Sequence, residues 1–547
     1  MTAPWATGMQ REGGEVAVSA GALLWCLFGG LFLVLRFAGI LSVPVGGAEL
    51  DGLAGAWQAH VGNSDPRFTP TFFQALVAAT FELSTSEMPA RALAFLASAS
   101  MPFALYRLRP VLGDGGALMA LLLLVFDAPG TVLGSTGSAP GFDLPIALWL
   151  FVLIQERRAR AWHWAPAGFV AATSGPVWLP LALGAGIVRL FRQEYPGREA
   201  LMYGMGGAAA GVALASLRFG VGWNGLVVPP FDLLANGFER EWSTESTGYL
   251  AALYFTPQIL LGLAVVAHEA YAVAGGSRLD RARMDLLAWG AAAGLWLIAA
   301  IGSHDPVPLA ALGLPLALVC GPAVARALSA ARAADWTDAR MGVPAIMAAL
   351  AIAAAFALQW ARAGRVGGTE EQLAVAGMAI VAVACVVWIG WERSSLPALA
   401  VPLAMVALLS AVASLSHVVF GSPQEPLTSP VSTLQAREIR DIAVEARSAQ
   451  GGLIVLHPSL ERALTWPFRD SGEVVVASGS VPDAVVVIWP ADAPPPDGFS
   501  PLDGRWAIAE ERRGPEAGVL DYLRWLANRN TLAVGRQTVN VYLKAAP

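Results

Sequence analysis

The feature that most constrains this chain is the repetition of apolar blocks about twenty residues long, separated by short polar segments. A helix of about 20 residues spans the roughly 30 Å hydrocarbon core of a bilayer. Of the 547 residues, 56% are hydrophobic and only 14% are charged, which is more apolar surface than one soluble core would bury. The pattern therefore predicts a polytopic membrane protein, mainly α, in which each block is a helix.

The hydropathy pattern predicts about thirteen transmembrane helices. They cover residues 16–38, 89–106, 115–133, 140–155, 163–175, 176–192, 199–219, 247–273, 285–302, 306–328, 342–361, 373–391 and 396–418. The first block is too long for the core of a signal peptide, so we expect it to be retained. The two short stretches that meet near Pro176 have a second interpretation as one broken helix.

The distribution of arginine predicts the orientation of the chain. Arginines near helix ends favour the cytoplasmic side of the membrane. With about thirteen spans, nearly all of the arginine clusters fall on one side. We therefore expect a multi-pass protein of the cytoplasmic (plasma) membrane. Its N-terminus would be cytoplasmic, and the region after about residue 420 would be extracytoplasmic.

Composition changes near residue 420 predict three domains. A transmembrane domain would cover 1–420, with long outer loops at 41–88 and 220–246. A proline-containing linker and an amphipathic helix would follow at 421–450. Short β-rich runs at 452–457, 474–477, 484–489 and 538–543 then alternate with a helical stretch at about 516–528. This pattern predicts a small extracytoplasmic α/β domain over 451–547.

Charge and cysteine use exclude several classes of function. The net charge is −6 and no basic run exists, so nucleic acid is not an expected partner. Cys26, Cys320 and Cys385 all lie inside apolar blocks, which excludes a disulfide framework or a CxxC metal site. Membrane lipid is an expected partner of every span.

Acidic residues near the outer ends of the predicted spans are the candidates for chemistry. Glu49 and Asp51 follow the first span, and Asp143 opens the fourth. On a turn, Glu49 and Asp51 would share one cavity as a general base or as ligands of a divalent cation. The alternative for Glu49 and Asp51 is that they lie at a helix N-terminus, where the helix dipole favours acidic residues. Asp143 likewise fits an ordinary helix start.

Two further outer segments carry polar groups that would meet a charged substrate. Arg240 is one of few outer arginines, so it would contact a phosphate or pair with a neighbouring glutamate. His304 and Asp305 lie in a short turn. This turn would either cover a substrate headgroup or be an ordinary solvated turn between two helices.

The order of these features resembles the GT-C superfamily of membrane glycosyltransferases, which includes the protein O-mannosyltransferases and the lipid A aminoarabinose transferase. Gly47-Ala48-Glu49 stands where that family has a Gly-Asp-Glu type motif. Thr69-Pro70-Thr71-Phe72-Phe73 is similar to its aromatic interfacial segment. Arg91 and Asp143 match the arginine of its second span and the acidic residue of its fourth.

The C-terminal region resembles the tail of an archaeal flippase-associated GT-C-like group. The similar segments are Leu464-Thr465-Trp466-Pro467-Phe468-Arg469-Asp470 and Tyr522-Leu523-Arg524-Trp525.

The resemblance implies transfer of a sugar, with inversion, from a polyprenyl-phosphate donor to a lipid, glycan or protein acceptor at the outer face. Glu49 or Asp51 would act as base, and Asp143 would orient the acceptor or help hold a divalent cation. Six residues would bind substrate, with Arg240 and His304 at the phosphate and the C-terminal pair at glycan: His60, Arg240, His304, Asp305, Trp466 and Arg469.

Two alternatives stay open. Ala48 replaces the first acidic residue of the motif, and the 302–308 turn lacks a basic residue, which favours a catalytically silent partner in glycan assembly or flipping. A transporter would show related halves or a path of intramembrane charges, and neither is clear in the sequence.

Overall fold

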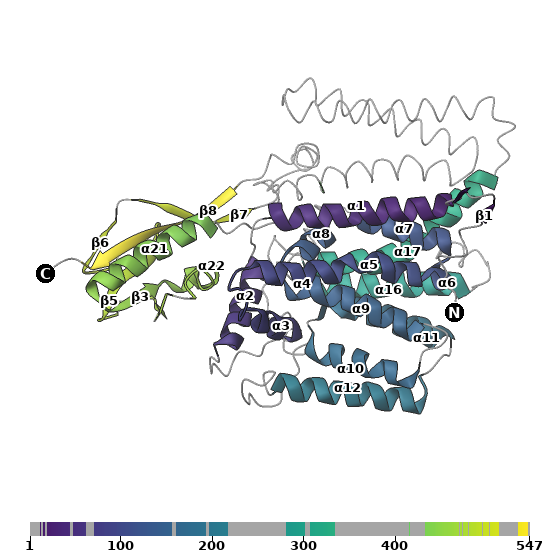
Figure 1. Ribbon diagram of the computed structural model, residues 1–547. Coiled ribbons are helices and arrows are strands. Elements are labelled where there is room, and N and C mark those ends of the chain that lie inside the picture. The colour runs from purple at the N-terminus through teal and green to yellow at the C-terminus, as the bar shows by residue number, and fades with distance from the viewer. Residues whose placement is uncertain are drawn as a thin grey trace, which may run out of the picture.

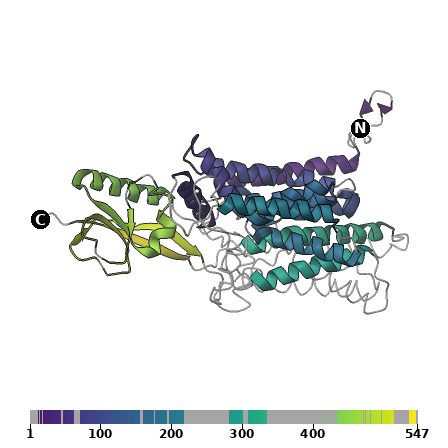
Figure 2. The same cartoon turned by 90° about the horizontal axis from the view of Figure 1, so that it is seen from below.

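The chain forms a bundle of helices with a smaller α/β unit at one end (Figures 1 and 2). The computed structural model describes residues 11–12, 15–16, 19–43, 47–61, 71–155, 160–174, 176–192, 196–216, 281–300, 307–333, 415, 433–469, 471–472, 474–479, 481–494, 496–502, 504–512 and 534–544. Within these residues, the helices α2 and α3 lie between the bundle and the α/β unit. We call this side of the molecule the domain end.

The main helices of the bundle lie side by side, as Figure 1 shows. They are α1 (Ala20–Ser42), α4 (Met88–Ala99), α5 (Met101–Arg107), α7 (Asp114–Val125), α8 (Ala128–Ser135), α9 (Ala139–Gln155), α10 (Trp164–Thr173), α11 (Leu179–Arg192), α12 (Arg198–Ser216), α16 (Arg281–Ala300) and α17 (Val307–Ala333). Further helices are α2 (Gly47–His60), α3 (Phe72–Thr80) and α6 (Arg109–Leu112), and a two-stranded ribbon, β1 (Arg11–Glu12) and β2 (Glu15–Val16), precedes α1. One apolar core joins α1, α7, α9, α16 and α17.

The predicted spans have different counterparts among these helices. Ala20–Leu41 and Met88–Arg107 are long and apolar enough to cross a membrane, and the bent pair α7–α8 makes a third candidate within the described residues. The predicted spans 140–155, 176–192, 285–302 and 306–328 contain shorter apolar helices. The spans 247–273, 342–361, 373–391 and 396–418 lie outside the described residues, apart from Leu415. The count of about thirteen therefore stays a prediction.

The predicted span 115–133 is broken in the middle. Its two halves, α7 and α8, meet at an angle of 71°. Pro129 lies in the first turn of α8 and has no backbone N–H to donate to the preceding turn, so a straight helix cannot continue through it. The break places Asp127, with an extended backbone, inside the bundle.

The two short stretches near Pro176 form separate helices with different neighbours. α10 packs on α12, whereas α11 packs on α16. Contact between α10 and α12 is at backbone distance, because a Cβ at Gly207 would overlap the carbonyl of Ala165. Small residues permit such close helix packing within a membrane.

The α/β unit is a six-stranded mixed sheet in the order β4-β3-β5-β8-β6, with β7 also paired to β8. Its strands are β3 (Leu453–Leu456), β4 (Val474–Val476), β5 (Ala484–Pro490), β6 (Phe499–Pro501), β7 (Trp506–Arg512) and β8 (Val534–Lys544). β3 runs parallel to β4 and β5, and β8 runs antiparallel to β5, β6 and β7. The sequence patterns predict β3, β4, β5 and β8, whereas β6 and β7 were not predicted. The predicted helical stretch near 516–528 lies outside the described residues.

One helix, α21 (Thr433–Gln450), covers a face of the sheet. It is the amphipathic helix expected from the sequence. Its buried residues Ala436, Ile439 and Ala443 recur at spacings of three and four, so they form one apolar stripe. Successive residues of β3 point to opposite faces of the sheet. Ile454 and Leu456 lie on the face that α21 covers.

The core beneath α21 continues into α2 and α3. Leu53, Phe73 and Phe81 belong to the same buried cluster as Ile439 and Val486 of the α/β unit. Polar contacts reinforce this junction, since Arg437 Nη2 lies 3.6 Å from Glu87 Oε1. The α/β unit is therefore packed on the segment between α1 and α4, which includes Glu49.

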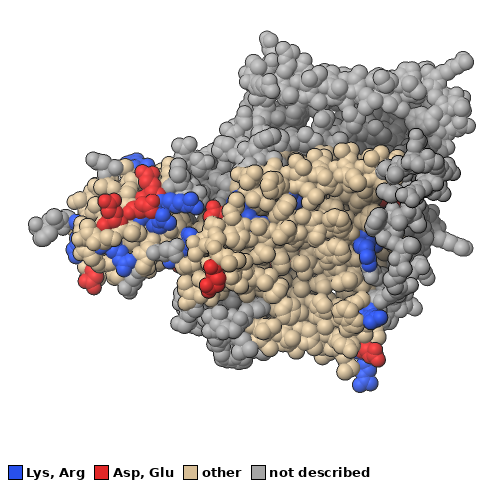
Figure 3. All heavy atoms as spheres, viewed as in Figure 1, with Lys and Arg blue, Asp and Glu red and all other residues tan. Residues whose placement is uncertain are grey.

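On the face drawn in Figure 3, charged side chains are nearly absent from the middle of the bundle surface. In Figure 3 the blue and red side chains gather on the α/β unit and at the opposite end of the bundle, with a nearly uncharged face between them. Exposed residues of the bundle include Leu27, Val34, Leu96 and Phe103. An uncharged, apolar surface of this kind is what lipid covers in a multi-pass membrane protein.

A pair of glycine substitutions tests the close packing of α12. Gly207→Ala is expected to destabilise the protein by about 1–3 kcal/mol, because the new methyl group overlaps the α10 backbone. Gly206→Ala is the matched control, since a Cβ there meets nothing within 4 Å. Thermal unfolding in detergent measures both, and equal midpoints for the two variants would contradict the packing.

Candidate active site

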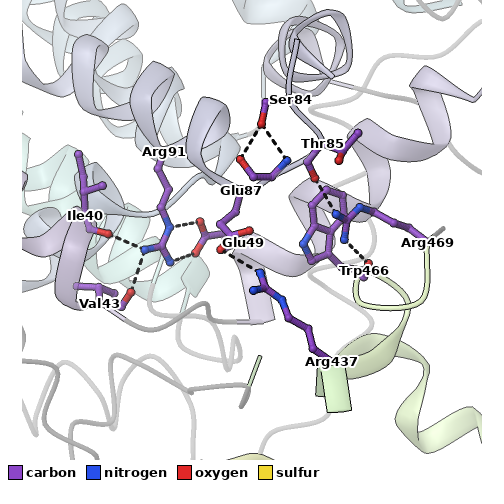
Figure 4. Close-up of polar contacts among 11 residues, drawn as sticks. Ile40, Val43, Glu49, Ser84, Thr85, Glu87, Arg91, Arg437, Trp466 and Arg469 are labelled. Carbon is purple, nitrogen blue, oxygen red and sulfur yellow. Dashed lines mark hydrogen bonds and ion pairs between the residues drawn. The ribbon is translucent and has the colours of Figure 1, made fainter. Parts of the chain in front are cut away.

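The candidate site is built on a buried ion pair between α2 and α4. Arg91 Nε donates to Glu49 Oε1 at 2.7 Å, and Arg91 Nη2 donates to Glu49 Oε2 at 2.8 Å (Figure 4). Glu49 is 1% exposed and Arg91 is 5% exposed. Two parallel hydrogen bonds between planar groups are the strongest arrangement that these side chains adopt.

The same pair holds two other parts of the chain. Arg91 Nη1 donates to the carbonyl oxygens of Ile40 and Val43, at 2.8 and 3.0 Å, and so fixes the end of α1. Glu49 Oε1 also accepts from the backbone N–H of Gly137 at 2.9 Å. The pair therefore connects α1, α2, α4 and the connection between α8 and α9.

Position 137 has room only for glycine. A Cβ there would lie 2.7 Å from the Cβ of Ala90 and 3.1 Å from Glu49 Oε1. Removing the side chain allows the backbone to approach the carboxylate closely enough to donate to it.

The geometry changes the interpretation of Glu49 and Asp51. Both lie in α2, not on a turn, so they are two positions apart on a helix and start from different faces. Of the two alternatives from the sequence, the helix start is the one observed, with Glu49 in the first turn of α2, and the turn is not. Both oxygens of Glu49 are taken by Arg91 and Gly137, so a metal ion would have to displace the arginine. Glu49 does not fit a metal ligand in this arrangement.

Asp143 follows Gly137, the backbone donor to Glu49, along the chain and is buried. It is 1% exposed in α9, six residues after Gly137. The preceding residue, Phe142, contacts the rings of Phe72 and Phe73 of α3, at 6.4 and 5.4 Å between centroids. Asp143 is thus held at the domain end of the bundle, beside the aromatic segment that follows α2.

The described part of the chain contains no group of three or more His, Cys, Asp or Glu side chains near enough to hold a metal ion. Arg240, His304 and Asp305 lie outside the described residues. The participation of these three residues, and of a divalent cation, stays a prediction.

The other predicted substrate-binding residues lie at the junction with the α/β unit. Trp466 is buried against Phe81, with ring centroids 5.6 Å apart. Arg469 lies over the Trp466 ring and donates from Nη2 to the carbonyl of Thr85 at 2.8 Å (Figure 4). His60 contacts the same aromatic group through Phe81, at 5.8 Å between centroids. Trp466 and Arg469 therefore connect the two parts of the molecule, whereas the contacts of His60 are with Trp57, Phe81 and Glu82 on its own side of the junction. The role of all three in binding substrate stays a prediction.

In the sequence, Arg91 is marked by the family resemblance alone, and no local pattern pairs it with Glu49. The available signal was an arginine within an apolar span, because an intramembrane charge requires a partner. Nothing in the sequence indicates that Gly137 donates to Glu49, because nearly every residue type has a backbone N–H.

Breaking the ion pair tests its role in holding the site together. Glu49→Met is expected to destabilise the protein by about 3–5 kcal/mol, because it leaves the Arg91 charge buried without its partner. Glu49→Met/Arg91→Met should recover part of that loss, since no buried charge remains. Glu82→Gln is the control, because this carboxylate is 79% exposed and 3.9 Å from His60. Chemical unfolding in detergent distinguishes these variants, and additive losses in the double variant would contradict the pairing.

Comparisons with known proteins identify the fold. No protein-family model matches the sequence, and no curated protein matches it. The similar solved structures include ArnT from Cupriavidus metallidurans bound to undecaprenyl phosphate, with a TM-score of 0.52, and the same protein in the apo state, with a TM-score of 0.50. In each case the sequence identity is 15%, and the match covers 87% of this chain and 94% of the ArnT chain. The chain therefore has an ArnT-like fold, as the resemblance to the GT-C superfamily implies.

Proposed function

We propose that this chain is a membrane glycosyltransferase of the GT-C type that takes its sugar from a polyprenyl-phosphate donor. The observation that carries the proposal is the similarity to ArnT over 87% of this chain and 94% of that one, in a structure where ArnT is bound to undecaprenyl phosphate. The resemblance of the sequence to the lipid A aminoarabinose transferase points the same way. A shared fold alone does not fix a reaction, so the site must support it as well.

The surface of the bundle suits a donor with a long apolar tail. The uncharged band between the two charged ends in Figure 3 would face lipid, where a polyprenyl chain is also soluble. The donor's phosphate and sugar need a polar environment, and the domain end supplies one beside this band. The candidate carboxylates Glu49 and Asp143 both lie at that end.

We assign different tasks to the carboxylates. The acceptor hydroxyl must lose its proton as its oxygen attacks C1 of the sugar, while the bond from C1 to the phosphate oxygen breaks and polyprenyl phosphate leaves. A carboxylate that takes this proton must be reachable by the acceptor. Glu49 is held on both oxygens by Arg91 and Gly137, so we assign it to positioning. We assign proton transfer to Asp51 or Asp143, with inversion at C1 as in-line attack requires. Asp143 is 1% exposed, so the acceptor would have to open the domain end to reach it.

The remaining roles follow from the resemblance. Arg240 and His304 would contact the donor phosphate, with Asp305 beside them. The acceptor would be a lipid, glycan or protein at the outer face of the cytoplasmic membrane.

One observation favours a second function. Ala48 occupies the position of an acidic residue in the GT-C motif, and the remaining acid, Glu49, is fully engaged with Arg91. A chain that kept the fold while losing its base would act as a silent partner in glycan assembly. It would bind polyprenyl phosphate without turning over.

Transfer of radiolabelled sugar from a panel of polyprenyl-phosphate sugars, by purified protein in lipid nanodiscs, separates these functions. Asp143→Asn is expected to lower turnover by about 10²–10⁴-fold, the usual contribution of a general base, without lowering the unfolding midpoint by as much as Glu49→Met does. Asp114→Asn is the matched control, because Asp114 is 86% exposed in α7.

Each outcome assigns a function. Turnover that Asp143→Asn leaves unchanged would remove Asp143 from the reaction. Wild-type protein that binds the donors but turns over none of them would contradict the transferase and favour the silent partner.

A further inference from the structure

Two charged residues lie inside the apolar part of the bundle, away from the candidate site. Arg36 belongs to α1 and is 1% exposed, and Asp127 lies at the break between α7 and α8 and is 3% exposed. Arg36 is six residues before the end of α1, which is about 9 Å along the helix at 1.5 Å per residue. Charges at such depth are costly and require a reason to be there.

The guanidinium group of Arg36 is not satisfied by its described neighbours. Nε and Nη1 are buried, and within the described part of the chain neither has a hydrogen-bond partner. The group lies 3.5 Å over the centroid of the Phe32 ring and is attracted by Asp127. No direct ion pair joins the two charges among the described residues. Leaving buried donors unpaired costs about 1–3 kcal/mol for each group.

A small cavity separates these groups. Its polar lining consists of Arg36, Asp127 and Ser98, and the rest is apolar, including Met101 and Leu124. It leaves about 10 Å³ for the centre of a water-sized sphere, which is close to the room that one water molecule needs.

Glycines keep this space open. A Cβ at Gly134 would lie 2.6 Å from Ser98 Oγ and 3.0 Å from Arg36 Nε, so both polar atoms face one point. A Cβ at Gly130 would overlap Asp127 Oδ2 and lie 3.6 Å from Arg36 Nη2. The guanidinium, the carboxylate and the hydroxyl therefore converge on the α8 surface, where side chains are missing.

We propose that the cavity is a binding site for one water molecule that bridges Arg36, Asp127 and Ser98. The lining carries one positive and one negative charge, so a neutral molecule that both donates and accepts fits it better than an ion. Water accepts from Arg36 and donates to Asp127, and a buried water usually has two to four such partners. The bridge joins α1, α4 and the α7–α8 break.

The bridge would also support the candidate site. Ser135 Oγ donates to the carbonyl of Arg36 at 3.1 Å, and Ser135 lies two residues before Gly137, which donates to Glu49. Fixing Arg36 therefore fixes the segment that meets Glu49. This inference is independent of the transferase reaction, because it concerns only how the bundle satisfies its buried charges.

Crystals of the full chain grown with sodium bromide in place of chloride test the occupant directly. We expect a density peak within hydrogen-bond distance of Arg36 Nε, Ser98 Oγ and Asp127, with no anomalous signal at the bromine edge. An anomalous peak would make the site an anion site and overturn the proposal. An empty cavity, or a direct Arg36–Asp127 ion pair, would also overturn it.

A double-mutant cycle provides a second measurement that does not need crystals. Arg36→Met and Asp127→Leu should each lower the unfolding midpoint, because each leaves one buried charge alone. The double variant should unfold above the more damaged single variant. Gly30→Ala is the control in α1, since a Cβ there meets nothing within 4 Å. Additive losses would show that the two charges are not coupled and would contradict the bridge.

Discussion

The ion pair between Glu49 and Arg91 is the constraint on which the domain end of this molecule depends. It is one charge-neutral contact, yet it holds the end of α1, the helix α2, the start of α4 and the chain before α9. A buried pair contributes little net stability compared with apolar packing, but removing one partner is costly. Because these contacts meet at one point, none of the four segments can shift without breaking at least one of them. The α/β unit then packs on the segment that the pair has fixed.

Much of the fold follows from hydropathy and periodicity. The apolar blocks predict the helices of the bundle, and the stripe of Ala436, Ile439 and Ala443 predicts α21. What hydropathy cannot supply is where a helix breaks. Pro129 ends α7 inside a block that reads as one continuous span, because a twenty-residue average does not detect a single missing N–H donor.

The candidate site was less accessible to sequence reasoning for a related reason. Arginines near helix ends predict the orientation of the chain. Arg36 is surrounded by apolar residues, so this pattern assigns it no function. Glu49 was identified from its position in an outer segment, but its partners are an arginine 42 residues away and a backbone N–H 88 residues away. Local patterns carry no information about such pairs. Trp466 and Arg469 are predicted to bind glycan from the resemblance of their segment, and the structure places both at the junction between the two parts.

Several of the contacts that join distant segments here end on main-chain atoms. Arg91 meets the carbonyls of Ile40 and Val43, Arg469 meets the carbonyl of Thr85, and Glu49 meets the N–H of Gly137. A main-chain acceptor is present whatever side chain the residue bears. The side chains at positions 40, 43 and 85 can therefore be replaced during evolution without loss of these hydrogen bonds. Replacing Arg91 or Arg469 would remove the donor. Correlated changes between paired positions, which reveal side-chain contacts in many proteins, would leave these links undetected.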